Sequence, residues 1–175
     1  PLNDAKTYKL LQKADTMGVF QLESSGMQNI LLKLGPTNFD DIIAIVALYR
    51  PGPLDSGMVE EFIERKRNPQ KVEYLHPSLE PILKDTMGVI VYQEQVMLIS
   101  QVMGGFTLPD ADKLRKAMSK KKMDIIDAME EKFVQGAKQK KIDESVARTM
   151  YDMMRTFGRY GFNKSHSAAY ALVSY

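Results

Sequence analysis

The sequence predicts a mainly α-helical protein with many helices and at most a small two-stranded β element. Apolar residues recur at helical spacing along most of the chain, and capping residues or Pro and Gly breakers separate one such stretch from the next. Only two short runs, residues 19–22 and 89–92, are rich in strand-forming residues. With 175 residues, of which 44% are hydrophobic, the chain is long enough to bury a core. Residues 1–175 are therefore expected to form a single domain.

The helices of the first half are predicted from their ends. Asn3 or Asp4 can cap the first helix, and Thr37 or Asn38 can cap the third, whose body at residues 42–48 is apolar all round and should be buried. The expected helices cover residues 4–15, 27–34, 38–48 and 58–67. The Arg-Pro-Gly-Pro run at residues 50–53 cannot continue the third helix, because proline lacks an N–H group, and it is expected to form a stiff loop.

Six further helices are expected in the second half. They cover residues 77–83, 93–103, 110–118, 124–139, 143–157 and 165–175, with glycines near several of their ends. The last one is still apolar at Tyr175 and carries no stop signal. Together with a first residue other than Met, this leads us to expect that the chain is cut from a longer protein.

A five-residue sequence occurs twice. Residues 15–19 read Asp-Thr-Met-Gly-Val and so do residues 85–89, and each copy leads into one of the two strand-forming runs. The two runs can pair as a small β-ribbon, with chance repetition as the alternative.

Composition and motifs exclude several classes of protein. The chain has no cysteine and two histidines, so disulfides and thiolate zinc sites are excluded, and a reducing, cytoplasmic location is expected. An apolar run long enough to span a membrane is absent. No Walker A loop, nucleophile elbow or converging set of carboxylates is present. We therefore expect no catalytic residue and no metal ligand in this chain.

Positive charge is concentrated in one short stretch. Residues 113–122 hold six Lys or Arg and no acid, although the formal net charge of the whole chain is only +2. At helical spacing Lys113, Lys116 and Lys120 share one side, with Arg115 and Lys122 near its edge. Cations this close repel one another unless an anion lies among them, and a polyphosphate suits such a set best. A solvated face of an amphipathic helix is the alternative.

Two other segments combine cations with turn residues. Residues 159–167 join Arg159 and Lys164 to two aromatic residues, and Ser165 or Asn163 can cap the helix that follows, whose free N–H groups suit phosphate. The aromatic rings suit stacking on a base or, alternatively, burial in the core. Arg50 leads into the Pro-Gly-Pro run, where a structural turn with a surface arginine is the favoured interpretation.

These segments carry a resemblance to a known family. Five motifs resemble, in order and spacing, the C-family replicative DNA polymerases of bacteria, the DNA polymerase III alpha subunit family. They are GVFQLES at 18–24, ALYRPGP at 47–53, YQEQVM at 92–97, ADKLRKAMSKKK at 111–122 and YGFNKSHSAAY at 160–170. Ser119 stands where the family usually has Gly, and Lys116 stands where it often has a second Arg.

The resemblance implies a portion of the polymerase fingers, with the palm, thumb and C-terminal domains outside this chain. The fingers of that family cover the nascent base pair and the incoming dNTP. By position, Arg115 and Lys116 correspond to its basic pair for the triphosphate, and Lys116 keeps the charge without the bidentate fork. Further dNTP- or phosphate-binding residues are expected at Lys120, Lys121, Lys122, Arg159, Asn163, Lys164, His166 and Arg50.

The same resemblance implies cofactors and partners. The whole enzyme is a nucleotidyltransferase that elongates DNA with Mg²⁺, whose ligands lie outside this segment, so this segment alone is not expected to be catalytic. Primer–template DNA and dNTP are the expected partners, with the sliding clamp, proofreading exonuclease and clamp loader for the whole protein, and no membrane. The residues alone leave two alternatives: a stand-alone helical nucleic-acid-binding module without catalysis, or a structural scaffold.

Overall fold

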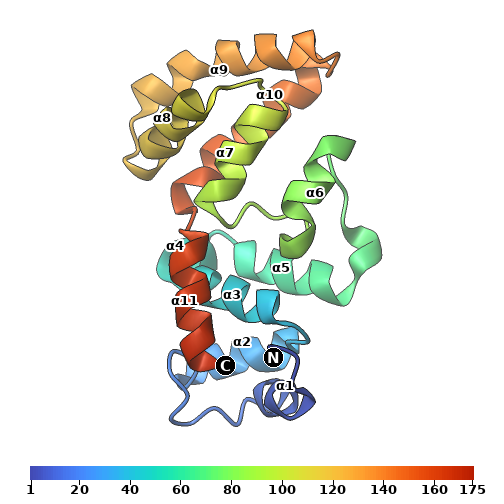
Figure 1. Ribbon diagram of the computed structural model, residues 1–175, viewed down its shortest axis with the longest axis vertical. Helices are drawn as coiled ribbons and strands as arrows, with labels where there is room; N and C mark the ends of the chain where they lie inside the picture. The colour runs from blue at the N-terminus through green and yellow to red at the C-terminus, as the bar shows by residue number, and fades with distance from the viewer. The chain divides into compact units, whose positions relative to one another are not determined.

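The computed structural model describes all 175 residues and divides them into two compact units. The first unit combines residues Pro1–Val72 with Asn163–Tyr175, and the second is Glu73–Phe162. Eleven α-helices and four short 3₁₀ helices make up the chain, which confirms the mainly α fold class (Figure 1). No helix has both the length and the apolar character needed to cross a membrane.

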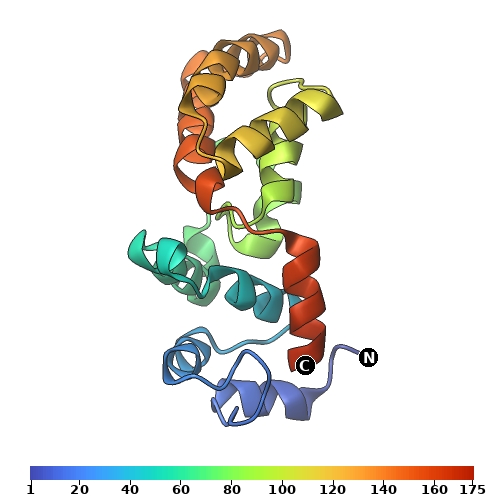
Figure 2. The ribbon, with the colours of Figure 1, turned by 90° about the vertical axis from the view of Figure 1, so that its left-hand side faces the viewer.

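The first unit is built from helices at both ends of its sequence. It contains α1 (Ala5–Gln12), α2 (Ser25–Leu34), α3 (Phe39–Leu48), α4 (Pro51–Asp55), α5 (Met58–Arg67), η1 (Pro69–Lys71) and α11 (Lys164–Ser174). Helix α11 packs against α3 (Figure 2), and the Ser167 hydroxyl donates a hydrogen bond to the Ile43 carbonyl. Helix α3 is buried on most of its surface, as its apolar sequence predicts.

Polar caps fix the starts of these helices. The Asp4 carboxylate accepts a hydrogen bond from the Thr7 N–H at 2.9 Å, which confirms the predicted first cap. At α3 the Asn38 side chain accepts from the Asp41 N–H at 3.0 Å, while the Asp41 carboxylate accepts from the Asn38 N–H at 3.2 Å. This reciprocal capping box satisfies two N–H groups that the helix itself leaves unpaired.

The loop predicted at residues 50–53 is wrong, because these residues open the short helix α4. Pro51 is its first residue and Pro53 its third. N–H groups at these positions have no partner within a helix, so proline loses nothing there, and its fixed φ favours the helical conformation. The sequence rule correctly ended α3 at Leu48 but did not recognise that the same prolines start a new helix.

The second unit carries the cation-rich segment. It contains η2 (Pro77–Leu79), α6 (Glu80–Leu83), η3 (Lys84–Thr86), α7 (Gln93–Val102), α8 (Leu108–Ser119), α9 (Met123–Gln139), α10 (Glu144–Phe157) and η4 (Gly158–Tyr160). Helix α8 packs against α7 and α9, and α10 packs against α9. In the core the Phe133 ring lies 6.1 Å from the Phe106 ring and 5.3 Å from the Tyr151 ring, between centroids. These ring contacts belong to the core against which α8 packs.

The predicted β-ribbon does not form. The Leu22 N–H bonds to the Val19 carbonyl within a turn, and the N–H groups of Val91 and Tyr92 both bond to the Gln95 side chain at 2.9 Å. The backbone groups that a ribbon would pair are therefore used locally. The only strand-like pairing is an isolated parallel bridge between Tyr92 and Phe162.

The two copies of the repeated five-residue sequence form related turns that are not identical. In both, the valine N–H bonds to the threonine carbonyl, at 3.0 and 2.9 Å, but Met87 has φ of +53° and Met17 does not have a positive φ. In both copies the threonine is fully buried, and its hydroxyl donates to a backbone carbonyl that follows, Leu22 for Thr16 and Val89 for Thr86. The glycine two residues later has φ of +78° in each copy, a conformation that other residues seldom adopt. The repeated sequence is therefore explained by the turn that follows the threonine, and not by a repeated domain.

Candidate anion-binding site

Helix α8 places its cations by an ordinary amphipathic pattern. The Thr107 side chain caps its start by accepting from the Asp110 N–H at 3.3 Å. The inward side is buried and consists of Ala111, Leu114, Ala117 and Met118, as predicted. The intervening positions therefore face outward, and the helix ends in a tight turn in which Lys121 has φ of +53°. The cations lie on this exposed side and on the turn.

Arg115 is held by two neighbours on different sides of its guanidinium. Its Nε and Nη2 donate to Oδ1 of Asp112 at 2.9 and 2.7 Å, and its Nη1 donates to Oε1 of Gln93 at 3.0 Å. A guanidinium has five N–H donors, so two remain for another acceptor. The side chain is 25% exposed, which leaves it accessible to a ligand.

Lys116 shares the same carboxylate but faces a different space. Its Nζ lies 2.6 Å from Oδ2 of Asp112, and its side chain is 60% exposed. The pKa of Asp112 is lowered, first by the hydrogen bond from Lys116 and then by that from Arg115. Asp112 is therefore a charged bridge between the two predicted triphosphate residues.

Lys116 lines a hollow together with three other lysines, Lys113, Lys120 and Lys122. This lysine hollow has a volume of about 410 Å³ and is also lined by Asp112 and by the apolar residues Pro109, Ala117 and Ile125. The predicted shared side of Lys113, Lys116 and Lys120 is thus confirmed, with Lys122 joining them. Arg115 does not line the hollow, so the predicted cations divide between two neighbouring faces of α8.

Lys121 and Arg159 lie in a third place. They line a hollow of about 370 Å³ with Met118, Met123 and Arg155. Arg155 is already paired with three acids, Asp127, Glu130 and Asp152. The Arg159 guanidinium lies 4.8 Å from the centroid of the Tyr160 ring, within cation–π range. Tyr160 and Phe162 are both half-buried, between the two outcomes that the sequence left open.

The remaining predicted residues belong to the first unit. Asn163 caps α11 by accepting from the His166 N–H at 2.8 Å, and the His166 ring lies 4.3 Å from the Tyr170 ring. Lys164 is the first residue of the helix and is half-buried. Arg50 Nε donates to the Ala47 carbonyl at 2.8 Å, and partial burial lowers the pKa of Arg50. Its side chain thus bonds to the last turn of α3, which agrees with the interpretation of Arg50 as part of a structural turn.

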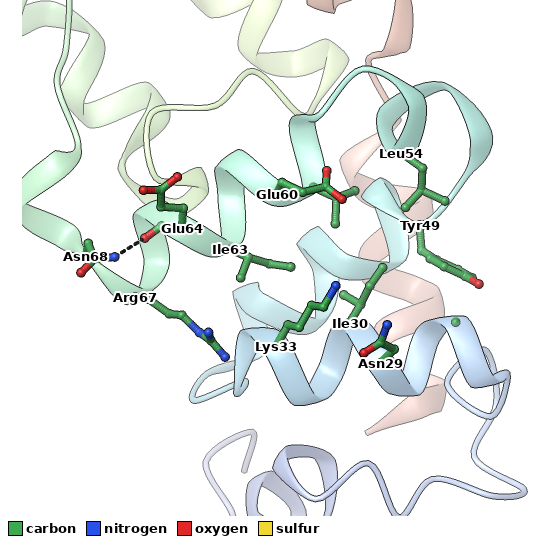
Figure 3. A pocket seen from close by; sticks show the side chains of 12 residues that line it. Asn29, Ile30, Lys33, Tyr49, Leu54, Glu60, Ile63, Glu64, Arg67 and Asn68 are labelled. Atoms are coloured by element: carbon green, nitrogen blue, oxygen red, sulfur yellow. Dashed lines mark hydrogen bonds between the residues drawn. The ribbon is translucent and has the colours of Figure 1, made fainter.

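One hollow of the first unit contains none of the predicted residues. It has a volume of about 490 Å³, and Figure 3 shows Lys33 of α2 opposite Glu60, Glu64 and Arg67 of α5. Glu64 pairs with Lys71 at 2.6 Å, and its carbonyl accepts from the Asn68 amide at 3.3 Å. Two cations and two acids line this hollow, whereas four lysines and one acid, Asp112, line the hollow beside α8.

Carboxylates do not assemble into a metal centre. No three His, Asp or Glu side chains come together to hold an ion, and Asp112 is occupied by two cations.

Fold and surface together define a mainly α-helical chain with a cluster of lysines on α8 and the turn after it. Residues 1–141 match the model of the bacterial DNA polymerase III alpha subunit finger domain. The chain belongs to this family.

Curated relatives match over the whole chain. DNA polymerase III subunit alpha of Aquifex aeolicus is 55% identical over 175 residues, that of Pseudomonas aeruginosa 54% over 180, and that of Escherichia coli K12 50% over 180. All of this chain is covered in each case, but only 15%, 15% and 16% of the relative. The chain therefore spans about a sixth of the length of these relatives.

Gln93 is the residue of this site that sequence reasoning missed as a polar contact. The sequence singled out Gln93 only as part of the YQEQVM motif. The three groups that bond to its side chain belong to residues 22, 26 and 68 positions away along the chain. Asp112 carried a local signal, because residues three and four apart are neighbours on a helix. Its pairing with Arg115 and Lys116 could have been predicted from that spacing.

Proposed function

We propose that this chain is the fingers portion of a bacterial replicative DNA-directed DNA polymerase and binds the triphosphate of the incoming dNTP beside the nascent base pair. The finger-domain match and the relatives named DNA polymerase III subunit alpha support this proposal. The whole protein would elongate a primer on template DNA in the cytoplasm, together with the clamp, exonuclease and clamp-loader subunits. Its Mg²⁺ ligands would lie outside this chain.

The arrangement of Arg115 is the observation that carries the proposal. Its guanidinium is fixed by Asp112 and Gln93, yet two of its N–H donors remain open. A donor fixed before the ligand arrives loses little entropy on binding. Phosphate oxygens are the acceptors that a guanidinium matches best.

Such cations act on the leaving group of the reaction. When a nucleotide is added, negative charge develops on the departing pyrophosphate, and preorganised donors stabilise that charge without reorganising. Arg115 supplies a directed contact, and Lys116 supplies a second charge, which is exposed and pairs with Asp112. We assign Lys113, Lys120 and Lys122 of the lysine hollow to further phosphate contacts.

Arg115→Ala in a full-length polymerase that carries this segment tests the proposal. We expect KM for dNTP to rise about 10- to 100-fold, because a charge-assisted hydrogen bond is worth about 1.5–3 kcal/mol. Affinity for primer–template should stay nearly unchanged. Steady-state kinetics with varied dNTP and a DNA-binding titration give both quantities.

Arg148→Ala is the matched control, because it removes an arginine of the same unit that pairs with Glu130, Glu131 and Glu144 on α9 and α10. It should leave KM for dNTP unchanged. If Arg115→Ala weakened DNA binding and had no effect on nucleotide, the cations would serve nucleic acid instead, as in a non-catalytic binding module.

A further inference from the structure

Gln93 connects Arg115 to a part of the second unit outside α8. It is the first residue of α7. Its Oε1 accepts from Arg115 Nη1 at 3.0 Å, while its Nε2 donates to Ser119 Oγ at 3.0 Å and to the Gly161 carbonyl at 3.2 Å. One amide thus bonds to both ends of the last turn of α8 and to the segment that follows η4.

These partners allow only one orientation of the amide. The Gly161 carbonyl can only accept and the Arg115 guanidinium can only donate, so the amide nitrogen must face Gly161 and the oxygen must face Arg115. A flipped amide would place like groups against each other at both contacts. The acceptor that faces Arg115 is therefore Gln93 Oε1, because the donors and acceptors around the amide allow no other orientation.

The backbone of Gln93 is held as firmly as its side chain. Its N–H donates to the Phe162 carbonyl at 2.9 Å, and the Phe162 N–H donates to the Val91 carbonyl at 2.9 Å. Gly161 lies close to Gln93, since a Cβ built there would lie 3.2 Å from Gln93 Cγ and 3.3 Å from Gln93 N. The anchor of the amide therefore does not depend on α8.

Gln93 supplies the only hydrogen bond that holds the Arg115 guanidinium from outside α8. The other partner, Asp112, lies on the same helix three residues away. A pair of side chains on one helix surface can change rotamer together, so Asp112 alone does not fix where the guanidinium lies. The bond to Gln93 adds a second fixed point on a different element.

We infer that Gln93 is the positioning residue that orients Arg115 toward the triphosphate, and that its contacts with Ser119 and Gly161 hold it in that role. This inference rests on the proposed function of Arg115. A donor displaced by a fraction of an ångström loses much of its effect on a developing charge. Gln93 therefore acts on nucleotide binding without touching the nucleotide.

A double-mutant cycle in the full-length polymerase tests the inference. Gln93→Met keeps the length of the side chain and removes both polar groups, and we expect it to raise KM for dNTP about 5-fold, less than loss of Arg115 itself. In the Arg115→Ala background the same change should alter KM less than about 2-fold, because the residue it positions is gone. Ser119→Ala, at an exposed position, removes one of the two acceptors of the amide and should raise KM by about 2-fold.

The outcomes separate positioning from a structural role. Thermal unfolding of each variant shows whether the fold has changed. If Gln93→Met lowered the unfolding temperature and left KM unchanged, Gln93 would only join α7 to the turn, and the inference would be wrong. Equal effects of Gln93→Met with and without Arg115 would also overturn it. If Arg115→Ala alone left KM unchanged, the proposed function would fail and the inference with it, a result visible in the single variant before the cycle is closed.

Discussion

Asp112 is the residue that controls the charge available at the predicted triphosphate pair. One of its oxygens accepts from Arg115 and the other from Lys116. Both bonds lower its pKa, Lys116 more than Arg115, so the carboxylate stays ionised at neutral pH. Under the proposed function, it competes with an incoming phosphate for the same two cations.

Asp112→Asn should make polyphosphate binding tighter. The amide keeps an oxygen for Arg115 and removes the competing charge. We expect the inhibition constant of pyrophosphate to fall about 2- to 5-fold, the range typical of partly exposed charge pairs. Product-inhibition kinetics at low and high salt measure it, and the effect should shrink as salt rises. Weaker inhibition by pyrophosphate would show that Asp112 mainly positions Arg115.

At the scale of single residues, the sequence predicted where the cations are concentrated better than it predicted which side chains they contact. Six cations in residues 113–122 are visible in the sequence. Where Lys120, Lys121 and Lys122 lie depends on the turn after Ser119, which no local pattern specifies. The contact of Arg115 with Gln93, 22 residues away, is not visible in the sequence either. Which cations share a ligand is therefore a tertiary property.

At the scale of elements, a close backbone contact fixes α9 against the connection between α7 and α8. A Cβ built on Gly136 of α9 would lie 1.8 Å from the Gly104 carbonyl oxygen. Backbone atoms cannot move aside as a flexible side chain can, so this contact requires glycine. It also sets the place from which α8 begins.

Gly136→Ala should destabilise the second unit. Forcing an extra methyl into a packed site costs about 1–3 kcal/mol, and the obstacle here is backbone. Urea unfolding of the 175-residue chain measures the loss. Gln135→Ala, one residue earlier at an exposed position, is the control and should change the free energy of unfolding by less than about 0.5 kcal/mol. Equal stability of the two variants would contradict the contact.

Elements were predictable where local chemistry decides them. Caps such as Asp4 and Asn38, and the apolar body of α3, define helices from the sequence alone. The β-ribbon failed because buried Thr16 and Gln95 satisfy the backbone groups of the two runs instead. Burial of these polar side chains follows from tertiary packing, and strand propensity does not reveal it.

At the scale of the whole molecule, positive charge is distributed by the pairing of acids. The second unit carries 14 Lys or Arg and 13 Asp or Glu, a formal net charge of only +1. Arg148 and Arg155 form ion pairs with acids of α9 and α10, and Lys132 forms an ion pair with Asp110. On α8 and the turn after it, Lys116 pairs with Asp112, whereas Lys113, Lys120, Lys121 and Lys122 form no ion pair. These four lysines concentrate positive charge within a nearly neutral unit, which favours attraction of a polyanion to this part of the surface.

The measurement that tests the central claim most directly is chemical protection of Arg115. A full-length polymerase carrying this segment would be bound to primer–template with a chain-terminated primer and treated with phenylglyoxal, which modifies accessible arginines. Peptide mass spectrometry then compares samples with and without the correct dNTP.

We predict that the correct dNTP slows modification of Arg115 several-fold and that Arg148 reacts equally in both samples. In a third sample without DNA, Arg115 should react as fast as in the sample with primer–template and no dNTP. Modification of Arg115 at the same rate with and without dNTP would contradict the claim that this chain holds the triphosphate.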